Sequence, residues 1–421
     1  MTTRGERRKD TELRRLGPGL ITGAADDDPS GIATYSQAGA QFGFAMLWTV
    51  VVTLPLMAAI QLVSARIGFI TGRGLTANIK QAFPRPVLLT IVGLLLVANT
   101  LNLAADIAAM AEALRLLVGG PSQVYAVTFG LPCLLLQVFL RYRSYVRWLK
   151  WLTLALLAYV AVVFTLRIEW GQVARELLWP SLPASRDVLL TIVAVFGTTI
   201  SPYLFFWQAG QEMEEVHNGA PPVRSEVQVQ RHLRRIQWDT LVGMTFSNLI
   251  AFFIILSTAV TLHVAGVRDI QTSAQAAEAL RPLAGDFTFL LFSLGIIGTG
   301  LLAVPVLAGS AAYAVAEAAG WQGSLDLRLE RGEGRGFYGV VALATLGGVA
   351  LCFMPVDPVR ALFWAAVLNG VISVPIMAVM MLLAARRDIM GPHIIGPRLR
   401  WLGWIATLAM GGTVLAMGLA F

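Results

Sequence analysis

Three consecutive acidic residues, Asp26, Asp27 and Asp28, stand in a stretch that is otherwise apolar or small. Pro29 follows them directly, and Gly31 comes soon after. A carboxylate near the middle of a bilayer costs about 2.5–3.5 kcal/mol on insertion scales and usually marks an ion or proton pathway. Because Pro lacks a backbone N–H and Gly is conformationally permissive, we expect a helix to unwind here. The carbonyl groups that are freed need protein, water or a cation as partner.

A second polar interruption lies in segment 195–204, where Thr198, Ser201 and Tyr203 surround a proline. Hydroxyl and carbonyl oxygens suit hard cations such as Mg²⁺, Ca²⁺ or Mn²⁺. Neither interruption contains Cys, Met or His, so neither offers a ligand that selects a soft metal. The alternative is that the Thr and Ser hydroxyls only satisfy helix carbonyl groups.

Four carboxylates are candidates for ion or proton handling. Asp28 is the first-choice cation ligand, because at the end of a half-helix its carboxylate joins free carbonyl groups and a negative helix dipole. Its alternative role is a helix cap. Asp26 and Asp27 are candidates for a vestibule or a proton-handling group, and Tyr203 at the second interruption is a candidate for the same vestibule or proton path. Asp106, inside the apolar segment 87–116, is a candidate proton site, or it holds a structural hydrogen bond to the broken helix.

The composition predicts a polytopic membrane protein. Of 421 residues, 56% are hydrophobic and only 14% are charged. Pro, Gly and charged residues divide the chain into eleven candidate membrane spans. These lie at 17–43, 45–70, 87–116, 122–140, 146–167, 188–215, 238–265, 286–318, 337–355, 358–385 and 399–420.

Basic residues are distributed unequally between the two sides of these spans. Of the 32 Lys and Arg residues, 24 fall on the side of the N-terminus and seven on the other side. The positive-inside rule therefore places the N-terminus in the cytoplasm and the C-terminus outside a plasma membrane (the inner membrane of a bacterium). The net charge of +7 reports topology and lipid contact, so we expect no nucleic-acid partner.

The two interrupted spans are the first and the sixth, which predicts two inverted repeats of five helices with a substrate site between them. The expected organisation is a cytoplasmic tail (1–16), a first repeat (17–167), an extracellular loop (168–187), a second repeat (188–385) and an eleventh helix (386–421).

The polar connection 208–235 holds several glutamates and then a basic amphipathic run that ends at Trp238. We expect it to form a short interfacial helix that joins the two halves. Asp239 and Glu317, at the ends of their spans, are predicted to be helix caps.

Several other chemistries are not expected. No HExxH, GxSxG or P-loop motif stands in a usable context, so we expect no enzyme and no cofactor. His217, His232 and His393 fall mostly in loops without metal-ligand spacing. Cys133 and Cys352 lie inside apolar segments and are predicted to be small core residues.

Several motifs resemble the first and sixth helices of the NRAMP divalent-metal transporters. GPGL at 17–20, DPSG at 28–31 and AGAQFG at 38–43 resemble the first helix, where that family carries DPGN. SPY at 201–203 occupies the place of the family's MPH. The resemblance covers nearly the whole chain in span number and order. It implies an all-α membrane protein with the LeuT-type fold and alternating access.

The departures from the family pattern fall on the metal ligands. The family's metal-binding Asp falls on Asp28 and its Ala carbonyl on Thr198, but Gly31 replaces its Asn, Ser201 its Met and Tyr203 its His. Loss of the thioether removes the ligand that favours transition metals. Loss of bulk leaves room for water, which Mg²⁺ gives up reluctantly.

In the third span, Asp106 resembles the family's acidic proton-path residue, but Ala109 stands where the family has Glu. Together these changes resemble the NRAMP-related magnesium transporter branch, which moves a hydrated ion without obligatory proton coupling.

The resemblance thus implies a transporter for Mg²⁺, also passing Mn²⁺, whose transport unit is a monomer. The implied ligands are the Asp28 carboxylate, the Thr198 and Gly31 carbonyls, the Ser201 hydroxyl and water. A first alternative is a proton-coupled Mn²⁺/Fe²⁺ importer that uses Asp106 and either Asp26 or Asp27. A second is a Na⁺-coupled organic solute symporter of the same fold.

Overall fold

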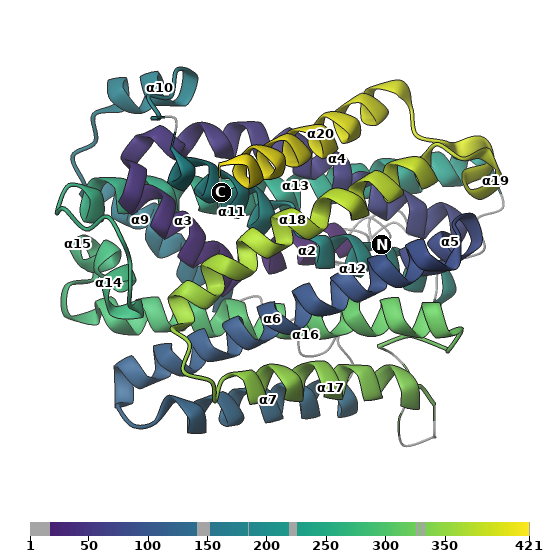
Figure 1. Cartoon of the computed structure of the whole chain (residues 1–421), viewed down its shortest axis with the longest axis horizontal. Coiled ribbons are helices and arrows are strands. Elements are labelled where there is room, and N and C mark those ends of the chain that lie inside the picture. Colours follow the sequence, from purple (N-terminus) through teal and green to yellow (C-terminus); the bar gives the residue numbers. More distant parts are fainter. Residues whose placement is uncertain are drawn as a thin grey trace, which may run out of the picture.

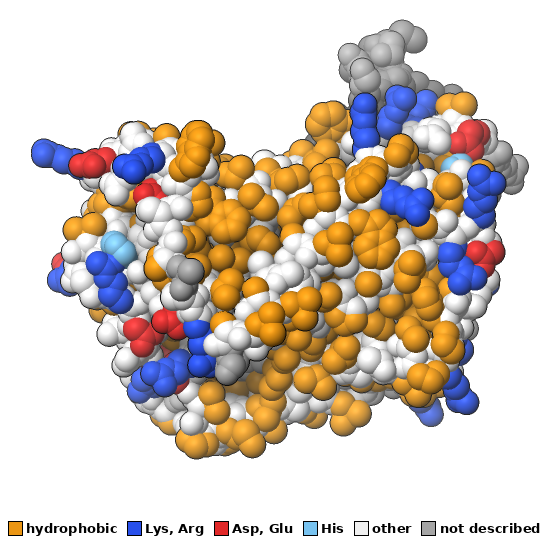
Figure 2. All heavy atoms as spheres, turned by 45° about the horizontal axis from the view of Figure 1, so that its top comes forward, with side chains coloured by type: hydrophobic (Ala, Val, Ile, Leu, Met, Phe, Trp, Pro, Cys, Tyr) orange, Lys and Arg blue, Asp and Glu red, His pale blue; other side chains and the backbone are white. Residues whose placement is uncertain are grey.

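The described residues form a bundle of helices that run side by side along the long axis of the molecule (Figure 1). The computed structural model describes residues 17–140, 152–183, 185–218, 225–325, 327, 329 and 333–420, and this part contains no strand. Charged side chains gather at the two ends of the bundle, and hydrophobic side chains cover the face between them (Figure 2). This distribution fits a protein whose waist is surrounded by lipid.

Helices lie at each of the eleven predicted spans. The first span is broken into α2 (Pro18–Asp26) and α3 (Pro29–Phe42), and the sixth into α11 (Arg186–Thr199) and α12 (Pro202–Asn218). Part of the fifth span and the predicted tail 1–16 lie outside the described residues. The remaining spans are α4 (Leu47–Thr71), α6 (Arg85–Val118), α7 (Ser122–Phe139), α9 (Leu157–Thr165), α13 (Glu226–Thr258), α16 (Thr288–Ala319), α17 (Arg335–Leu351), α18 (Pro358–Ala384) and α20 (Pro397–Leu419).

Short helices cover the two ends of the bundle. One end carries α5 (Leu75–Ala82) and α19 (Arg387–Met390), and we call it the α5 end. The other carries α10 (Trp170–Leu178), α14 (Ser273–Ala277) and α15 (Arg281–Ala284), and we call it the α10 end (Figure 1). The connections that the sequence assigns to opposite sides of the membrane therefore lie at opposite ends. By length and composition, eight helices of the described part can cross a membrane, or nine if α9 and α10 form one bent span.

The expected interfacial helix between the two halves is not formed as a separate element. The glutamates of this connection lie in α12, which runs to Asn218, and the basic run forms the first turns of the long helix α13. Leu233 and Ile236 of α13 pack against Ala65 and Phe69 of α4. Because this packing buries the apolar face of the run inside the protein, the run continues α13 instead of lying on the membrane surface.

The two predicted caps act on neighbouring helices. Asp239 of α13 accepts a hydrogen bond from the N–H of Gly19, 2.8 Å away, at the start of α2. Glu317 of α16 accepts one from the N–H of Ala77, 3.0 Å away, in the first turn of α5. Both carboxylates therefore satisfy N–H groups that have no partner within their own helix.

Helix α2 lies directly against the backbone of α13. A Cβ atom added at Gly23 would lie 2.3 Å from the backbone of Gly243, and one at Gly243 would lie 2.3 Å from the carbonyl oxygen of Gly19. Gly19 and Gly23 are four residues apart, the spacing at which small residues let membrane helices approach closely. This contact fixes the short half-helix that carries Asp26 at its end.

We expect Gly23→Ala to lower the thermal stability of the protein, because the new methyl group collides with backbone atoms of α13. Overpacking of this kind typically costs about 1–3 kcal/mol. Gly93→Ala on α6 is the matched control, since a Cβ there meets nothing within 4 Å. Melting of both variants in detergent, followed by size-exclusion chromatography, measures the difference. Equal melting temperatures would contradict the close contact.

Candidate cation site at two helix breaks

Both predicted interruptions are present, and both are buried. Helix α2 ends at Asp26 and α3 begins at Pro29, so two aspartates lie in the gap between them. Helix α11 ends at Thr199 and α12 begins at Pro202. In each case a proline occupies the first helical position, where its missing N–H costs no hydrogen bond.

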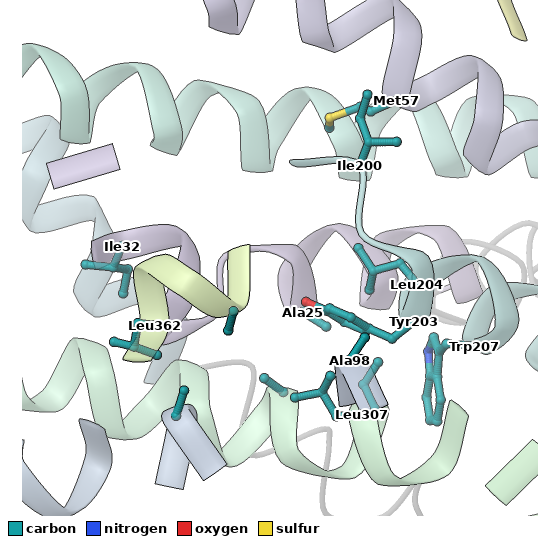
Figure 3. Close-up of a cluster of buried hydrophobic side chains, with 14 of the residues drawn as sticks. Ala25, Ile32, Met57, Ala98, Ile200, Tyr203, Leu204, Trp207, Leu307 and Leu362 are labelled. Carbon is teal, nitrogen blue, oxygen red and sulfur yellow. The ribbon is translucent and has the colours of Figure 1, made fainter. Parts of the chain in front are cut away.

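The carboxylate of Asp28 joins the two breaks. Its Oδ1 accepts a hydrogen bond from the N–H of Gly31 at 2.7 Å and thereby caps α3. Its Oδ2 accepts one from the hydroxyl of Tyr203 at 2.9 Å, in the first turn of α12. The Tyr203 hydroxyl is directed toward Ala25 of α2 (Figure 3). Asp28 is therefore a cap, the alternative role considered for it, and also a contact between the two half-helices.

Gly31 faces oxygen atoms from both breaks. A Cβ atom added there would lie 3.4 Å from the Thr198 hydroxyl and 3.4 Å from the backbone carbonyl oxygen of Asp26. That carbonyl is in the last turn of α2, where carbonyl groups have no intrahelical partner. The Gly31 carbonyl lies in the first turn of α3, so helix geometry directs it along the helix, toward the N–H of Tyr35. Asp26 therefore offers the better-placed backbone oxygen, and Gly31 leaves space beside it.

The Ser201 hydroxyl satisfies carbonyl groups of the preceding half-helix. Its single proton is shared between the carbonyl oxygens of Thr198, 2.7 Å away, and Gly197, 3.0 Å away. This is the alternative that the sequence left open for a hydroxyl at a break. A carbonyl oxygen and a hydroxyl oxygen each keep a further lone pair, so both remain able to contact a cation.

Four polar side chains that the sequence analysis did not single out hold the second break. Ser373 of α18 donates to the carbonyl of Ile200, and Gln61 of α4 donates to the carbonyl of Leu204. The hydroxyl groups of Tyr35 and Thr199 are 3.0 Å apart and link α3 to α11. Each of the four is a polar side chain in an apolar span, which is the signal that identifies them.

Asp26 and Asp27 turn toward α13 and share one donor. The hydroxyl of Ser247 lies 2.6 Å from an Asp26 oxygen and 3.0 Å from an Asp27 oxygen. The second oxygen of each carboxyl is buried without a hydrogen-bond partner in the described part of the chain. Because a hydroxyl has one proton to donate, at most one of these two contacts is a hydrogen bond from Ser247 at a time.

Asp106 of α6 is buried, and neither of its carboxyl oxygens has a hydrogen-bond partner among the described residues. It lies near enough to Asp28 and Tyr203 to interact with them electrostatically. The backbone N–H of Ser30, in the first turn of α3, stabilises the Asp106 carboxylate, so the contact to the broken helix that was considered for it is present, although it falls short of hydrogen-bond geometry. One helical turn away, the side-chain amide of Asn102 is also buried and has no hydrogen-bond partner among the residues that the structure describes.

The centre of the protein thus holds four buried carboxyl groups: Asp26, Asp27, Asp28 and Asp106. None of the ion pairs found between described residues involves any of them. Several buried carboxylates without an opposite charge are costly, so a cation or protons must compensate them. The chemistry of this centre is therefore cation or proton binding by oxygen atoms.

We expect Ser247→Ala to destabilise the protein by about 1–3 kcal/mol, because it removes the shared donor from two buried carboxyl groups. Ser257→Ala is the matched control on the same helix, since that buried hydroxyl donates only to the carbonyl of Ile254. Thermal melting of the two purified variants measures the difference. A loss no greater than in the control would mean that Ser247 does not support the acidic residues.

Comparison with known proteins places this arrangement in a family. The family described as Natural resistance-associated macrophage protein-like (Nramp) matches residues 19–420. A manganese transporter of Eremococcus coleocola, in complex with an aromatic bis-isothiourea substituted compound, has a similar structure, with a TM-score of 0.73 and 16% identity over 96% of this chain and 85% of that chain.

Mhp1, a nucleobase-cation-symport-1 family transporter in a closed conformation with bromovinylhydantoin bound, is similar with a TM-score of 0.61 and 16% identity, over 97% of this chain and 90% of that chain. The fold is therefore the LeuT-type fold that the sequence predicted, with its first and sixth helices broken. From its sequence match over almost its full length, the chain belongs to the Nramp family.

Proposed function

We propose that the protein carries divalent metal ions across a membrane by alternating access, with Mg²⁺ as the preferred ion and Mn²⁺ as a second substrate. The observation that carries this proposal is the group of buried carboxyls that have no counter-ion within the described part of the chain, at the point where two half-helices end. Membership of the Nramp family and the structural likeness to a manganese transporter support the divalent-metal class.

The proposed ligands are all oxygen atoms. Asp28 supplies the charge, the Thr198 carbonyl and the Ser201 hydroxyl supply further oxygens, and water completes the shell. The Gly31 carbonyl that the resemblance implied is directed along α3, so Gly31 contributes space for water beside the ion. The position of the Asp26 carbonyl adds a backbone oxygen to this set. An oxygen-only site favours hard cations, and retained water suits Mg²⁺ in particular.

We propose that metal movement is not obligatorily coupled to protons. The Tyr203 phenol, which donates to Asp28, keeps its proton at neutral pH, whereas an imidazole exchanges one readily. In the third span, Ala109 stands where the family has Glu, so this position carries no acidic group.

An access route from the α10 end supports the transport reading. A cavity of about 290 Å³ lies there between α3, α11 and α18. The exposed side chains of Asp187, Asp269 and Arg360 lie at its mouth. The buried residues Ala33 of α3 and Thr191 of α11 line its inner end. Exposed carboxylates at such a mouth raise the local concentration of cations.

We infer that the α5 end faces the cytoplasm of a cell whose plasma membrane holds the protein, because basic residues are concentrated in the connections of that side. The transport unit is a monomer in this proposal, since both breaks and all proposed ligands belong to one chain.

A proton-coupled Mn²⁺/Fe²⁺ importer is the second candidate. The observation that favours it is Asp106, a buried acid without a hydrogen-bond partner in the described part of the chain, close to Asp28. Asp26 and Asp27 offer further proton acceptors near the same gap. A Na⁺-coupled organic solute symporter has less support, because several carboxyl groups crowded into one centre fit a monovalent ion and an organic solute poorly.

We expect Asp28→Asn to reduce Mg²⁺ uptake into proteoliposomes to the level of empty liposomes, because the site loses its negative charge. Asn caps helices as well as Asp does, so α3 stays capped. Asp357→Asn is the matched control, since Asp357 caps α18 in the same way, directly before a proline. Full Mg²⁺ uptake by the Asp28 variant would contradict the site assignment.

We expect Ser201→Met to raise the ratio of Mn²⁺ to Mg²⁺ uptake several-fold, because a thioether beside the site favours transition metals. Ser201→Ala separates this effect from loss of the hydroxyl that contacts the Gly197 and Thr198 carbonyls. Initial uptake rates of both ions in each variant measure it. An unchanged ratio in the Met variant would show that Ser201 does not face the transported ion.

A further inference from the structure

A second group of metal-ligating side chains lies well away from the two breaks. Glu212 and Glu215 are on α12, and His232 is on α13. One ligand atom from each of these side chains lies within 4.8 Å of the other two. Because α12 begins at Pro202, Glu212 stands roughly 15 Å along that helix from the second break. The group is therefore separate from the central carboxylates.

The imidazole of His232 is held in one orientation. Its ring stacks on Phe69 of α4, with 4.0 Å between the ring centroids and 7° between the planes. In this position its Nε2 lies 3.6 Å from a carboxyl oxygen of Glu212. A stacked ring with its nitrogen directed at a carboxylate is a preorganised metal ligand.

Glu212 is the feature that an ordinary surface ion pair does not explain. Its side chain is 1% exposed, and neither carboxyl oxygen has a hydrogen-bond partner in the described part of the chain. A buried carboxylate that is not hydrogen-bonded is costly unless a cation compensates it. Its partners in the group, His232 and Glu215, are less buried and leave the group accessible from the α5 end.

Arg235 supplies the positive charge in the present conformation. Its guanidinium forms an ion pair with Glu215 and lies 3.9 Å from Glu212 and 3.2 Å from Nε2 of His232. The Arg235 side chain is 43% exposed, so it has room to turn toward solvent. It stands where a metal ion would neutralise the same two carboxylates.

We propose that Glu212, Glu215 and His232 form a second metal site, which takes a transition-metal cation such as Mn²⁺ in place of the Arg235 guanidinium. Imidazole with carboxylates suits Mn²⁺ or Zn²⁺, whereas Mg²⁺ prefers oxygen ligands alone. Neighbouring ligand atoms on one such ion are roughly 3–4 Å apart, and Nε2 of His232 already lies 3.6 Å from a carboxyl oxygen of Glu212.

Occupancy of this site ties α12 to α13. Helix α12 is the half-helix that starts at the second break and carries Tyr203, the residue that contacts Asp28. A transition metal at the α5 end would therefore bind the same half-helix that carries Tyr203, with a ligand set that Mg²⁺ does not favour.

The test counts Mn²⁺ bound to the full-length protein in detergent by electron paramagnetic resonance, in the Asp28→Asn background and with excess Mg²⁺ present. This background removes the central site, so the result does not depend on which ion that site carries. We expect one bound Mn²⁺, and at least a tenfold loss of affinity in His232→Gln. His393→Gln is the matched control, since His393 faces Glu226 at 3.5 Å in a similar pair.

A second variant separates a metal site from a purely structural ion pair. Arg235→Gln removes the competing positive charge, so we expect Mn²⁺ to bind about tenfold more tightly. Unchanged or weaker binding in Arg235→Gln would overturn the proposal. Unchanged binding in His232→Gln would overturn it as well. So would a result in which neither the parent protein nor Arg235→Gln binds Mn²⁺.

Discussion

The structure depends on one electrostatic constraint: four carboxyl groups are buried near two helix breaks, and none forms an ion pair in the described part of the chain. Hydrogen-bond donors on the surrounding helices lower the cost of burying these carboxyl groups. Asp28 receives two donors from two different half-helices, and Ser247 shares one donor between the other two aspartates of the first break. What these donors leave uncompensated is negative charge, which a divalent cation can neutralise.

The positions of the breaks could be predicted from the sequence, because a proline after polar residues in an apolar span has a local physical effect. The partners that hold the breaks could not. Ser247, Gln61 and Ser373 lie between about 140 and 220 positions from the groups they contact, so their roles depend on how the helices pack. Ser201 shows the same limit. A serine at a helix break can contact a cation or satisfy a helix carbonyl, and only the structure shows that its hydroxyl donates to the carbonyl of Thr198.

The wrong prediction for the connection between the two halves has a tertiary cause, and it also placed His217 and His232 in loops although they lie in α12 and α13. The basic run before Trp238 has the pattern of a membrane-surface helix, but Leu233 and Ile236 bury their side chains against α4. The same packing brings His232 onto Phe69 and toward Glu212. Sequence spacing alone gave no metal-ligand pattern for this histidine, because its neighbours come from a different helix. Imidazole is thus absent from the centre of the protein and present beside carboxylates at the α5 end.

The central claim is that an oxygen-only site moves Mg²⁺ without obligatory proton movement. It is tested most directly by ion flux into proteoliposomes that hold the purified protein, with Mg²⁺ and Mn²⁺ compared and the lumenal pH recorded. The account predicts saturable Mg²⁺ uptake with no change in lumenal pH. Mn²⁺ uptake accompanied by lumenal acidification, with no Mg²⁺ flux, would contradict it and would assign the protein to proton-coupled metal import.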